Sequence, residues 1–319
     1  MTGPGSGRSG TVDGPEIAIL MATWNGAAHL AEQLQSIARQ TWCNWSLWVS
    51  DDGSTDGTRA IVETFARQNP ARTVRIVEGP QQGATANFLS LLKRADVPSV
   101  HVAFSDQDDV WLPAKLERAM ERLSAVPVGR PGLYGCRVMR MEAGGRLLGP
   151  SPVWHRGPSF ANALVQNIIG GHATVMNPEA VALVRRASEC AEVPAHDWWV
   201  YLVVSGCGGT VIADPVPLLN YRQHEGNLMG ANSRLRARLR RLDWIRQGEF
   251  ARWIDGNLAA LEHLPGMLTP EAGRLVAEFA ALRRARGLGA ARRLWASRIH
   301  RQSRAETLLL YWAAAAGRL

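Results

Sequence analysis

Three aspartates in four residues directly follow an apolar run at residues 99–104. They are Asp106, Asp108 and Asp109, in the stretch Ser105-Asp106-Gln107-Asp108-Asp109-Val110-Trp111-Leu112-Pro113. Adjacent carboxylates repel one another, so a fold tolerates this cluster where it stays hydrated or receives a cation. If strand geometry persists, Asp106 and Asp108 project to the same side, and such oxygen ligands suit Mg²⁺ or Mn²⁺. The alternative is a hydrated loop in which Asp109 caps the helix that Pro113 opens.

The apolar run before these aspartates is one of four expected strands that alternate with helices. The strands are expected at residues 16–22, 45–50, 74–78 and 99–104. Helical patterns occur at 30–40 and 113–124, in a segment with Ile61, Val62 and Phe65 that stops before Pro70, and in a segment with Phe88, Leu89 and Leu92. This alternation is typical of a Rossmann-like, mostly parallel sheet with helices on both faces. Ligands of such sheets bind at the carboxyl ends of the strands, where Trp24, Asp51 and Asp52 also stand. No GxGxxG follows an expected strand and no Walker sequence occurs, which argues against a dinucleotide or P-loop site.

The regular alternation ends after residue 124. We expect a mobile surface loop at 149–159, strands at 132–140, 170–177, 211–213 and 216–221, and helices at 178–190 and 196–204. From residue 234 onward only helical patterns occur, in three or four segments. The expected fold is therefore α/β, followed by an α-helical carboxyl-terminal region.

Charge is unevenly distributed along the 319 residues, whose net charge is +8. Residues 231–319 hold 17 arginines and no lysine against seven acidic residues, which favours an anionic partner for this region. We expect a disordered leader at 1–14, an α/β domain at 15–230 and a basic helical region at 231–319. No apolar stretch approaches the ~20 residues of a spanning helix. The four cysteines show no ligand or disulfide spacing, so a cytoplasmic location is expected.

Four motifs stand in an order that resembles a known family. They are Thr23-Trp24-Asn25, Asp51-Asp52-Gly53-Ser54-Thr55-Asp56-Gly57-Thr58, the aspartate stretch at 105–111, and His196-Asp197-Trp198-Trp199. Their order and spacing resemble a family 2 glycosyltransferase with the GT-A fold. The ending Tyr221-Arg222-Gln223-His224-x-x-Asn227-x-x-Gly230 looks like its bacterial rhamnosyltransferase branch. The resemblance covers residues 16–230, so it identifies 15–230 as a GT-A catalytic domain.

The resemblance implies binding of a nucleotide-sugar donor and of Mg²⁺ or Mn²⁺. In the family an aromatic residue such as Trp24 stacks on the base, and a carboxylate such as Asp52 accepts a hydrogen bond from it. The implied nucleotide-binding residues are Thr23, Trp24, Asn25, Asp52 and Asp106, and the implied metal ligands are Asp108, Asp106 and His224. Arg222 and His224 are implied at the diphosphate, all the more because Ala86 replaces an arginine that many members carry. The alternatives are a core aromatic for Trp24, a helix cap for Asp52 and a structural or surface role for His224.

Asp197 matches the residue that deprotonates the acceptor hydroxyl in the family. Direct displacement at the anomeric carbon needs a base opposite the leaving group, which inverts the configuration. Gly171, His172 and Trp198 correspond to a stretch near donor sugar and acceptor, where glycine permits close backbone approach. The alternative for Asp197 is the N-cap of a helix beginning at Trp198.

The resemblance thus implies an inverting, metal-dependent glycosyltransferase that moves L-rhamnose from dTDP-rhamnose to a cell-envelope or polysaccharide glycan. One alternative is the same chemistry with a UDP-hexose. Another is a nucleic-acid-binding protein that uses the basic carboxyl-terminal helices, although those residues lie outside the aromatic and acidic motifs.

The basic helices carry apolar faces among their arginines. One interpretation is that these faces lie on the anionic inner face of the cell membrane, which would suit a lipid-linked acceptor. The alternative is that they pack on the catalytic domain. Their apolar residues are Leu235, Leu239, Leu242 and Ile245 in one segment and Leu294, Trp295 and Ile299 in another.

Overall fold

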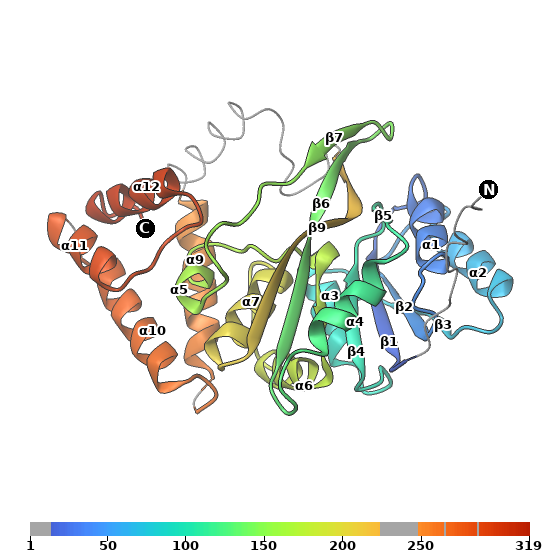
Figure 1. The fold of residues 1–319 in the computed structure, drawn as a ribbon, viewed down its shortest axis with the longest axis horizontal. Coiled ribbons are helices and arrows are strands. Elements are labelled where there is room, and N and C mark those ends of the chain that lie inside the picture. The colour runs from blue at the N-terminus through green and yellow to red at the C-terminus, as the bar shows by residue number, and fades with distance from the viewer. Residues whose placement is uncertain (1–13, 224–247, 265, 286) are drawn as a thin grey trace, which may run out of the picture.

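Four parallel strands form the amino-terminal half of the sheet, in the spatial order β3-β2-β1-β4 (Figure 1). The computed structural model describes residues 14–223, 248–264, 266–285 and 287–319. Strand β1 pairs Thr23 with Asp51 of β2 and Met21 with Ser105 of β4, so the carboxyl ends of these strands lie side by side. The predicted alternation of strands and helices is confirmed. Its elements are β1 (Ile17–Thr23), α1 (Leu30–Ala38), β2 (Trp45–Asp51), α2 (Thr58–Gln68), β3 (Val74–Glu78), α3 (Ala84–Lys93) and β4 (His101–Ser105).

The other half of the sheet is mixed, and the order continues as β8-β6-β9-β5. Strand β8 (Val175–Met176) runs antiparallel between β4 and β6 (Gly132–Glu142), and β9 (Thr210–Gln223) runs parallel to β6. At the edges, β5 (Val110–Trp111) pairs antiparallel with β9, and β7 (Leu147–Pro150) with β6. The two short strands predicted at 211–213 and 216–221 are one strand, whose register with β6 shifts between Cys136 and Met139.

The strand predicted at 170–177 is wrong in its first half. Gly171–Ala173 form the 3-10 helix η1, and only Val175 and Met176 pair in the sheet. A tight turn is required here because the backbone at Gly171 approaches the ring of His196, where an added Cβ would lie 2.7 Å from Nε2. The turn sets the direction of His172, which is its middle residue.

Helices cover both faces of the sheet because β1 and β2 are apolar on both sides. Ala18, Leu20 and Trp48 pack on one side, and Ile19 and Val49 pack on the other. The remaining helices of the domain are α4 (Lys115–Leu123), α5 (Phe160–Ala163), α6 (Pro178–Ala187) and α7 (His196–Gly206). Side chains of α3, α6 and α7 join the first core, and those of α1, α2 and α4 join the second.

Four carboxyl-terminal helices pack beside α5 and α7 (Figure 1). They are α9 (Glu249–Glu262), α10 (Pro270–Arg283), α11 (Leu288–Ala296) and α12 (Arg304–Ala315). Leu294 and Ile299 are fully buried, whereas Trp295 is 68% exposed. Helix α11 packs against α10 and α12, so packing of its apolar face on the catalytic domain stays a prediction. The apolar residues expected at 235–245 lie outside the described residues, as does most of the expected leader. Among the described residues, no helix is both long and apolar enough to span a bilayer.

Candidate active site

The candidate site lies at the carboxyl ends of β1, β2 and β4, where the polar motifs converge. Trp24 follows β1 and is 62% exposed, so the alternative of a core aromatic is wrong. Its backbone is held by the side chain of Gln107, whose Oε1 accepts from Trp24 N at 2.9 Å and whose Nε2 donates to Trp24 O at 3.0 Å. Gln107 thus joins the end of β1 to the aspartate stretch after β4.

The loop after β2 is organised by Asp51, which is buried. Its carboxylate accepts hydrogen bonds from the hydroxyls of Thr23 at 3.0 Å and Ser54 at 2.6 Å. Asn25 adds a second connection: its backbone N–H donates to Ser54 Oγ, and its Oδ1 accepts from Thr55 N. Asn25 has φ of 46°, a left-handed conformation that asparagine tolerates better than most residues. Thr23 and Asn25 therefore shape the rim beside Trp24.

Asp52 is buried and holds the loop between β3 and α3. Its two carboxylate oxygens accept from the backbone N–H groups of Gln81 at 2.6 Å and Gly83 at 2.9 Å. An added Cβ on Gly79 would lie 2.7 Å from Asp52 Oδ1, which explains the glycine. Each carboxylate oxygen can accept a further hydrogen bond. The helix-cap alternative for Asp52 is wrong, because its partners belong to this other loop and α2 has no side-chain cap.

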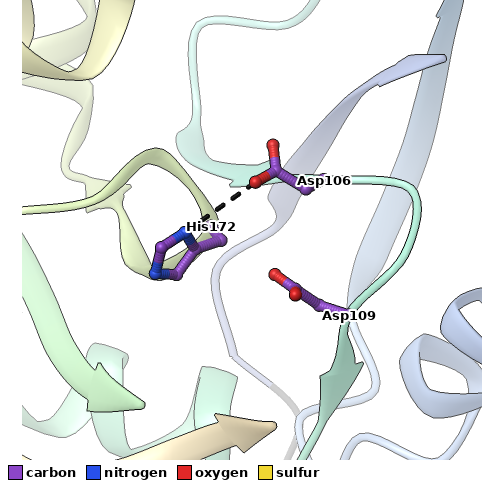
Figure 2. Close-up of side chains that lie close together, drawn as sticks. All are labelled: Asp106, Asp109 and His172. Carbon is purple, nitrogen blue, oxygen red and sulfur yellow. Dashed lines mark ion pairs between the residues drawn. The ribbon is translucent and has the colours of Figure 1, made fainter. Parts of the chain in front are cut away.

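Asp106, Asp109 and His172 form the acidic centre of the site. Figure 2 shows the two aspartates on the segment after β4, with His172 facing them from η1. Asp106 Oδ2 and His172 Nδ1 are 3.8 Å apart, and one ligand atom from each of the three residues lies within 4.8 Å of the others. The His172 ring also packs on Tyr221 of β9, with ring centroids 4.6 Å apart. These contacts come from residues far apart in the sequence.

The charges of this centre are strongly coupled. Burial raises the pKa of Asp109 well above its usual value, and repulsion by Asp106 and Asp108 adds to this effect. Burial would also raise the pKa of Asp106, but the interaction with His172 outweighs it and lowers that pKa. Burial opposes protonation of His172, yet the interaction with Asp106 and the charge of Asp109 raise its pKa above 6.5. The raised pKa values of Asp109 and His172 show that added positive charge is favourable at this centre, and a cation would supply it.

The residues present fit a divalent cation. Asp109 is fully buried, and its Oδ2 has no hydrogen-bond partner among the described residues, whereas Oδ1 accepts from Arg222 N at 3.2 Å. A buried carboxylate oxygen without a donor is costly, and a cation would satisfy it. Two carboxylates and an imidazole are a suitable donor set for Mn²⁺ and, less so, for Mg²⁺.

The structure brings together at this centre a group of side chains that differs in part from the expected ligands. Strand β4 ends at Ser105, so the alternation that would align Asp106 with Asp108 does not continue. Asp109 joins Asp106 instead, and it caps no helix, because α4 begins at Lys115 after Ala114. Asp108 is half-buried nearby, and its charge acts on Asp109. A metal contact by Asp108 stays a prediction, and His224 lies outside the described residues.

Arg222 is buried and holds the segments around the acidic centre together. Its Nε donates to Asp108 O at 2.9 Å, one terminal nitrogen donates to Ala143 O at 2.8 Å, and the other pairs with Glu32. The side chain is 3% exposed. Its described hydrogen bonds serve protein groups of three segments, so a diphosphate contact stays a prediction.

Asp197 stands in the first turn of α7, next to η1. Its Oδ2 accepts from Gly171 N at 3.0 Å, and its Oδ1 accepts from Trp198 N at 2.7 Å. The N-cap alternative is wrong, because the helix begins at His196 and its N-cap is Ala195. Trp198 itself lies in the core, 4% exposed, where its indole N–H donates to Ala163 O, so its observed contacts are structural. The turn η1 therefore connects Asp197, through Gly171, with the acidic centre, through His172.

Sequence reasoning missed several residues that shape the site. Gln107 and Asp109 stand inside the recognised stretch, but only the three-dimensional contacts reveal their partners. Lys115 is fully buried, and its Nζ lies 3.4 Å from the centroid of the Trp111 ring. In the part of the chain that the structure describes, Nζ has no hydrogen-bond partner. Burial lowers its pKa to about 8. No sequence pattern distinguishes this lysine from a surface lysine.

Comparison with known proteins places the chain in a family. Residues 18–173 match the model of glycosyl transferase family 2. The dTDP-rhamnosyl transferase RfbG of Shigella flexneri is 30% identical over 236 residues, which are 71% of this chain and 79% of that protein. The chain therefore belongs to glycosyl transferase family 2, and it is a transferase.

Two solved structures share the fold. TarS 1-349 of S. aureus, in complex with UDP-GlcNAc, matches with a TM-score of 0.57 and 17% identity over 82% of this chain and 70% of that chain. The mannosyltransferase PcManGT of Pyrobaculum calidifontis, in complex with GDP-Man and Mn²⁺, matches with a TM-score of 0.52 and 20% identity over 95% of this chain and 86% of that chain. The predicted GT-A fold is confirmed.

Proposed function

We propose that the chain is an inverting, metal-dependent glycosyltransferase that transfers L-rhamnose from dTDP-rhamnose to a cell-envelope or polysaccharide glycan. The observation that carries the proposal is the junction at η1. On one side Gly171 N–H holds Asp197, and on the other His172 faces Asp106 and Asp109. A base and a cation site thus flank one short turn, as displacement at a sugar carbon between them requires. The similarity to RfbG supports dTDP-rhamnose as the donor.

The residues at the ends of β1 and β2 bind the nucleotide in this proposal. Trp24 offers an exposed ring on which the thymine base stacks, a contact worth about 1–3 kcal/mol. Asp52 accepts a hydrogen bond from the base imino N–H with a free lone pair, while its loop contacts hold it still. Thr23 and Asn25 line the same rim, and Asp106 reaches the ribose or the ion.

Asp106, Asp109 and His172 hold the divalent ion, with Asp108 beside them, and Mn²⁺ or Mg²⁺ is the ion proposed. When bound, the ion supplies Lewis-acid stabilisation of the departing diphosphate. Arg222 keeps the carbonyl of Asp108 and the backbone of the loop in place, and its charge near the leaving group is the proposed contribution to the diphosphate. His224, close in sequence to Arg222, is proposed to complete the diphosphate site.

Asp197 acts as the base. The two backbone N–H groups that it accepts from fix the carboxylate, and each oxygen keeps a lone pair for the acceptor hydroxyl. The proton of that hydroxyl passes to Asp197 while the hydroxyl oxygen attacks the anomeric carbon, so the configuration inverts. Gly171 lets the turn lie close to α7, because an added Cβ there would meet His196. The acceptor glycan lies on this side, free or linked to a lipid.

A transfer assay tests the proposal. The purified full chain, with Mn²⁺ or Mg²⁺, is supplied with dTDP-rhamnose or a UDP-hexose and with glycan acceptors, and the product linkage is read by NMR. We expect turnover of dTDP-rhamnose, inversion at the anomeric carbon, and a loss of about 10³-fold or more in Asp197→Asn. Faster turnover of a UDP-hexose would show that the donor is a UDP-hexose and not dTDP-rhamnose. Full activity of Asp197→Asn would refute the mechanism. Asp255→Asn, a surface change on α9, is the matched control.

A further inference from the structure

The outer faces of α11 and α12 expose four large apolar side chains. Leu288 and Trp295 of α11 are 86% and 68% exposed, and Leu308 and Trp312 of α12 are 67% and 54% exposed. The two residues are seven positions apart in α11 and four apart in α12, which places the members of each pair on one side of their helix. The opposite sides carry the buried residues Leu294 and Leu310, so these outer faces are not needed for the core. Large apolar side chains exposed on two adjacent helices mark a candidate interaction site.

The same faces carry positive charge. Residues 287–319 contain six arginines and a single acidic residue, Glu306, which pairs with Arg301 at 3.5 Å. Arg292 is exposed and lies four residues after Leu288 and three before Trp295, while exposed Arg304 precedes Leu308 by four. Arginine, tryptophan and leucine therefore share the outer side of each helix.

The two helices form one unit that is fixed to the catalytic domain. Helix α11 packs against α12, and Gly287 N donates to Ala315 O at 2.9 Å, so the helices run in opposite directions. The segment between them is bound to the turn after α5: Arg301 donates to Val165 O at 2.8 Å, and Gln302 N donates to Gln166 Oε1 at 2.7 Å. A partner that binds these helices therefore orients the whole catalytic domain.

We infer that the outer faces of α11 and α12 bind an anionic lipid bilayer. Trp295 and Trp312 lie at the level of the headgroups, Leu288 and Leu308 enter the acyl boundary, and the arginines contact lipid phosphates. Helices of nine and 12 residues lie in the plane of the surface. A nucleic acid would engage the arginines but would leave the leucines in water, so the apolar share of the surface favours lipid. The inference is independent of the sugar that the enzyme transfers.

Vesicle binding by the full chain tests this inference. Sedimentation is measured with vesicles of phosphatidylcholine alone and of phosphatidylcholine and phosphatidylglycerol in equal parts. We expect binding to the anionic vesicles only, and a loss of about tenfold or more in W295S/W312S, because binding follows the apolar area inserted. Replacing Arg292, Arg293 and Arg304 by glutamine should weaken binding by about a hundredfold. The matched control is Val128→Ser, a fully exposed apolar residue in the turn after α4, which should bind like the parent.

Several outcomes would overturn the inference. Equal binding to both vesicle types, no binding to either, or anionic binding that survives both sets of substitutions would each contradict it. Binding of duplex DNA without vesicle binding, lost in the arginine variant, would assign the surface to nucleic acid. A concentration-dependent dimer lost in W295S/W312S, again without vesicle binding, would assign it to a second copy. Both variants should keep the parent's melting temperature and donor turnover, because their side chains lie outside the core and the site.

Discussion

Gly171→Ala should uncouple the base from the rest of the site while leaving the fold intact. The new Cβ would lie 2.7 Å from Nε2 of His196, and the two atoms must move apart by about 0.7 Å to reach the 3.4 Å of ordinary contact. The His196 ring cannot retreat, because it is buried and stacks on Phe88 at 4.1 Å with Phe104 at its edge. The turn η1 must move instead and take Gly171 N–H away from Asp197 Oδ2. A displacement of about 1 Å at a reacting group costs about 10²-fold in rate.

The assay for this prediction separates turnover from donor binding. We expect kcat of Gly171→Ala to fall by about a hundredfold, while the affinity for dTDP in the presence of Mn²⁺, measured by calorimetry, stays close to that of the parent. The matched control is Gly273→Ala in the first turn of α10, where an added Cβ meets nothing within 4 Å. That control should keep full activity and gain about 0.5–1 kcal/mol in unfolding free energy. Unchanged kcat in a folded Gly171→Ala protein would refute the role assigned to η1.

Three further predictions concern single side chains. Trp24→Ala should weaken dTDP binding by about tenfold or more, since stacking is worth about 1–3 kcal/mol, and unchanged affinity in calorimetry would exclude stacking. In metal-free protein the protonated ring of His172 stabilises the fold, because its pKa is raised above 6.5. This stabilisation is fully present below pH 6.5 and is lost as the pH rises through the raised pKa of His172. The stability difference between the parent and His172→Gln, from urea unfolding with chelator, should therefore shrink with rising pH, and a growing difference would contradict the pairing. Lys115→Met should raise the unfolding free energy at pH 7 by about 1 kcal/mol. The lowered pKa of Lys115 corresponds to a burial penalty of about 3 kcal/mol, and the cation–π contact with Trp111 offsets about 2 kcal/mol of it. A large loss of stability would show that Lys115 is needed where it lies.

Much of the fold follows from local patterns in the sequence. The runs at β1 and β2 are apolar on both faces and end in polar motifs, so their type and their carboxyl ends were predictable. The segment at 170–174 was not, because two glycines, a threonine and an alanine fit a strand as well as a tight turn. The approach of Gly171 to the His196 ring decides between them, and that contact spans 25 residues of sequence.

The candidate site was predictable in its location and less so in its exact members. Trp24, Asp106 and Asp197 could be identified from their motifs, whereas the choice of Asp109 as the partner of Asp106 depends on where β4 ends. Trp198 stands beside Asp197 in the same motif, yet it is buried, because the helix turns it toward the core. A motif fixes residue types and spacing, and the direction of each side chain depends on elements that pack against it from elsewhere.

Calorimetric titration of dTDP tests the central claim most directly. The claim is that Asp106, Asp109 and His172 hold a divalent ion that binds the nucleotide diphosphate. The account predicts that Mn²⁺ tightens dTDP binding to the parent by about tenfold or more relative to chelator, that Asp109→Asn loses this gain, and that the surface variant Asp96→Asn keeps it. Equal affinity for dTDP with Mn²⁺ and with chelator, or a full gain in Asp109→Asn, would contradict the account.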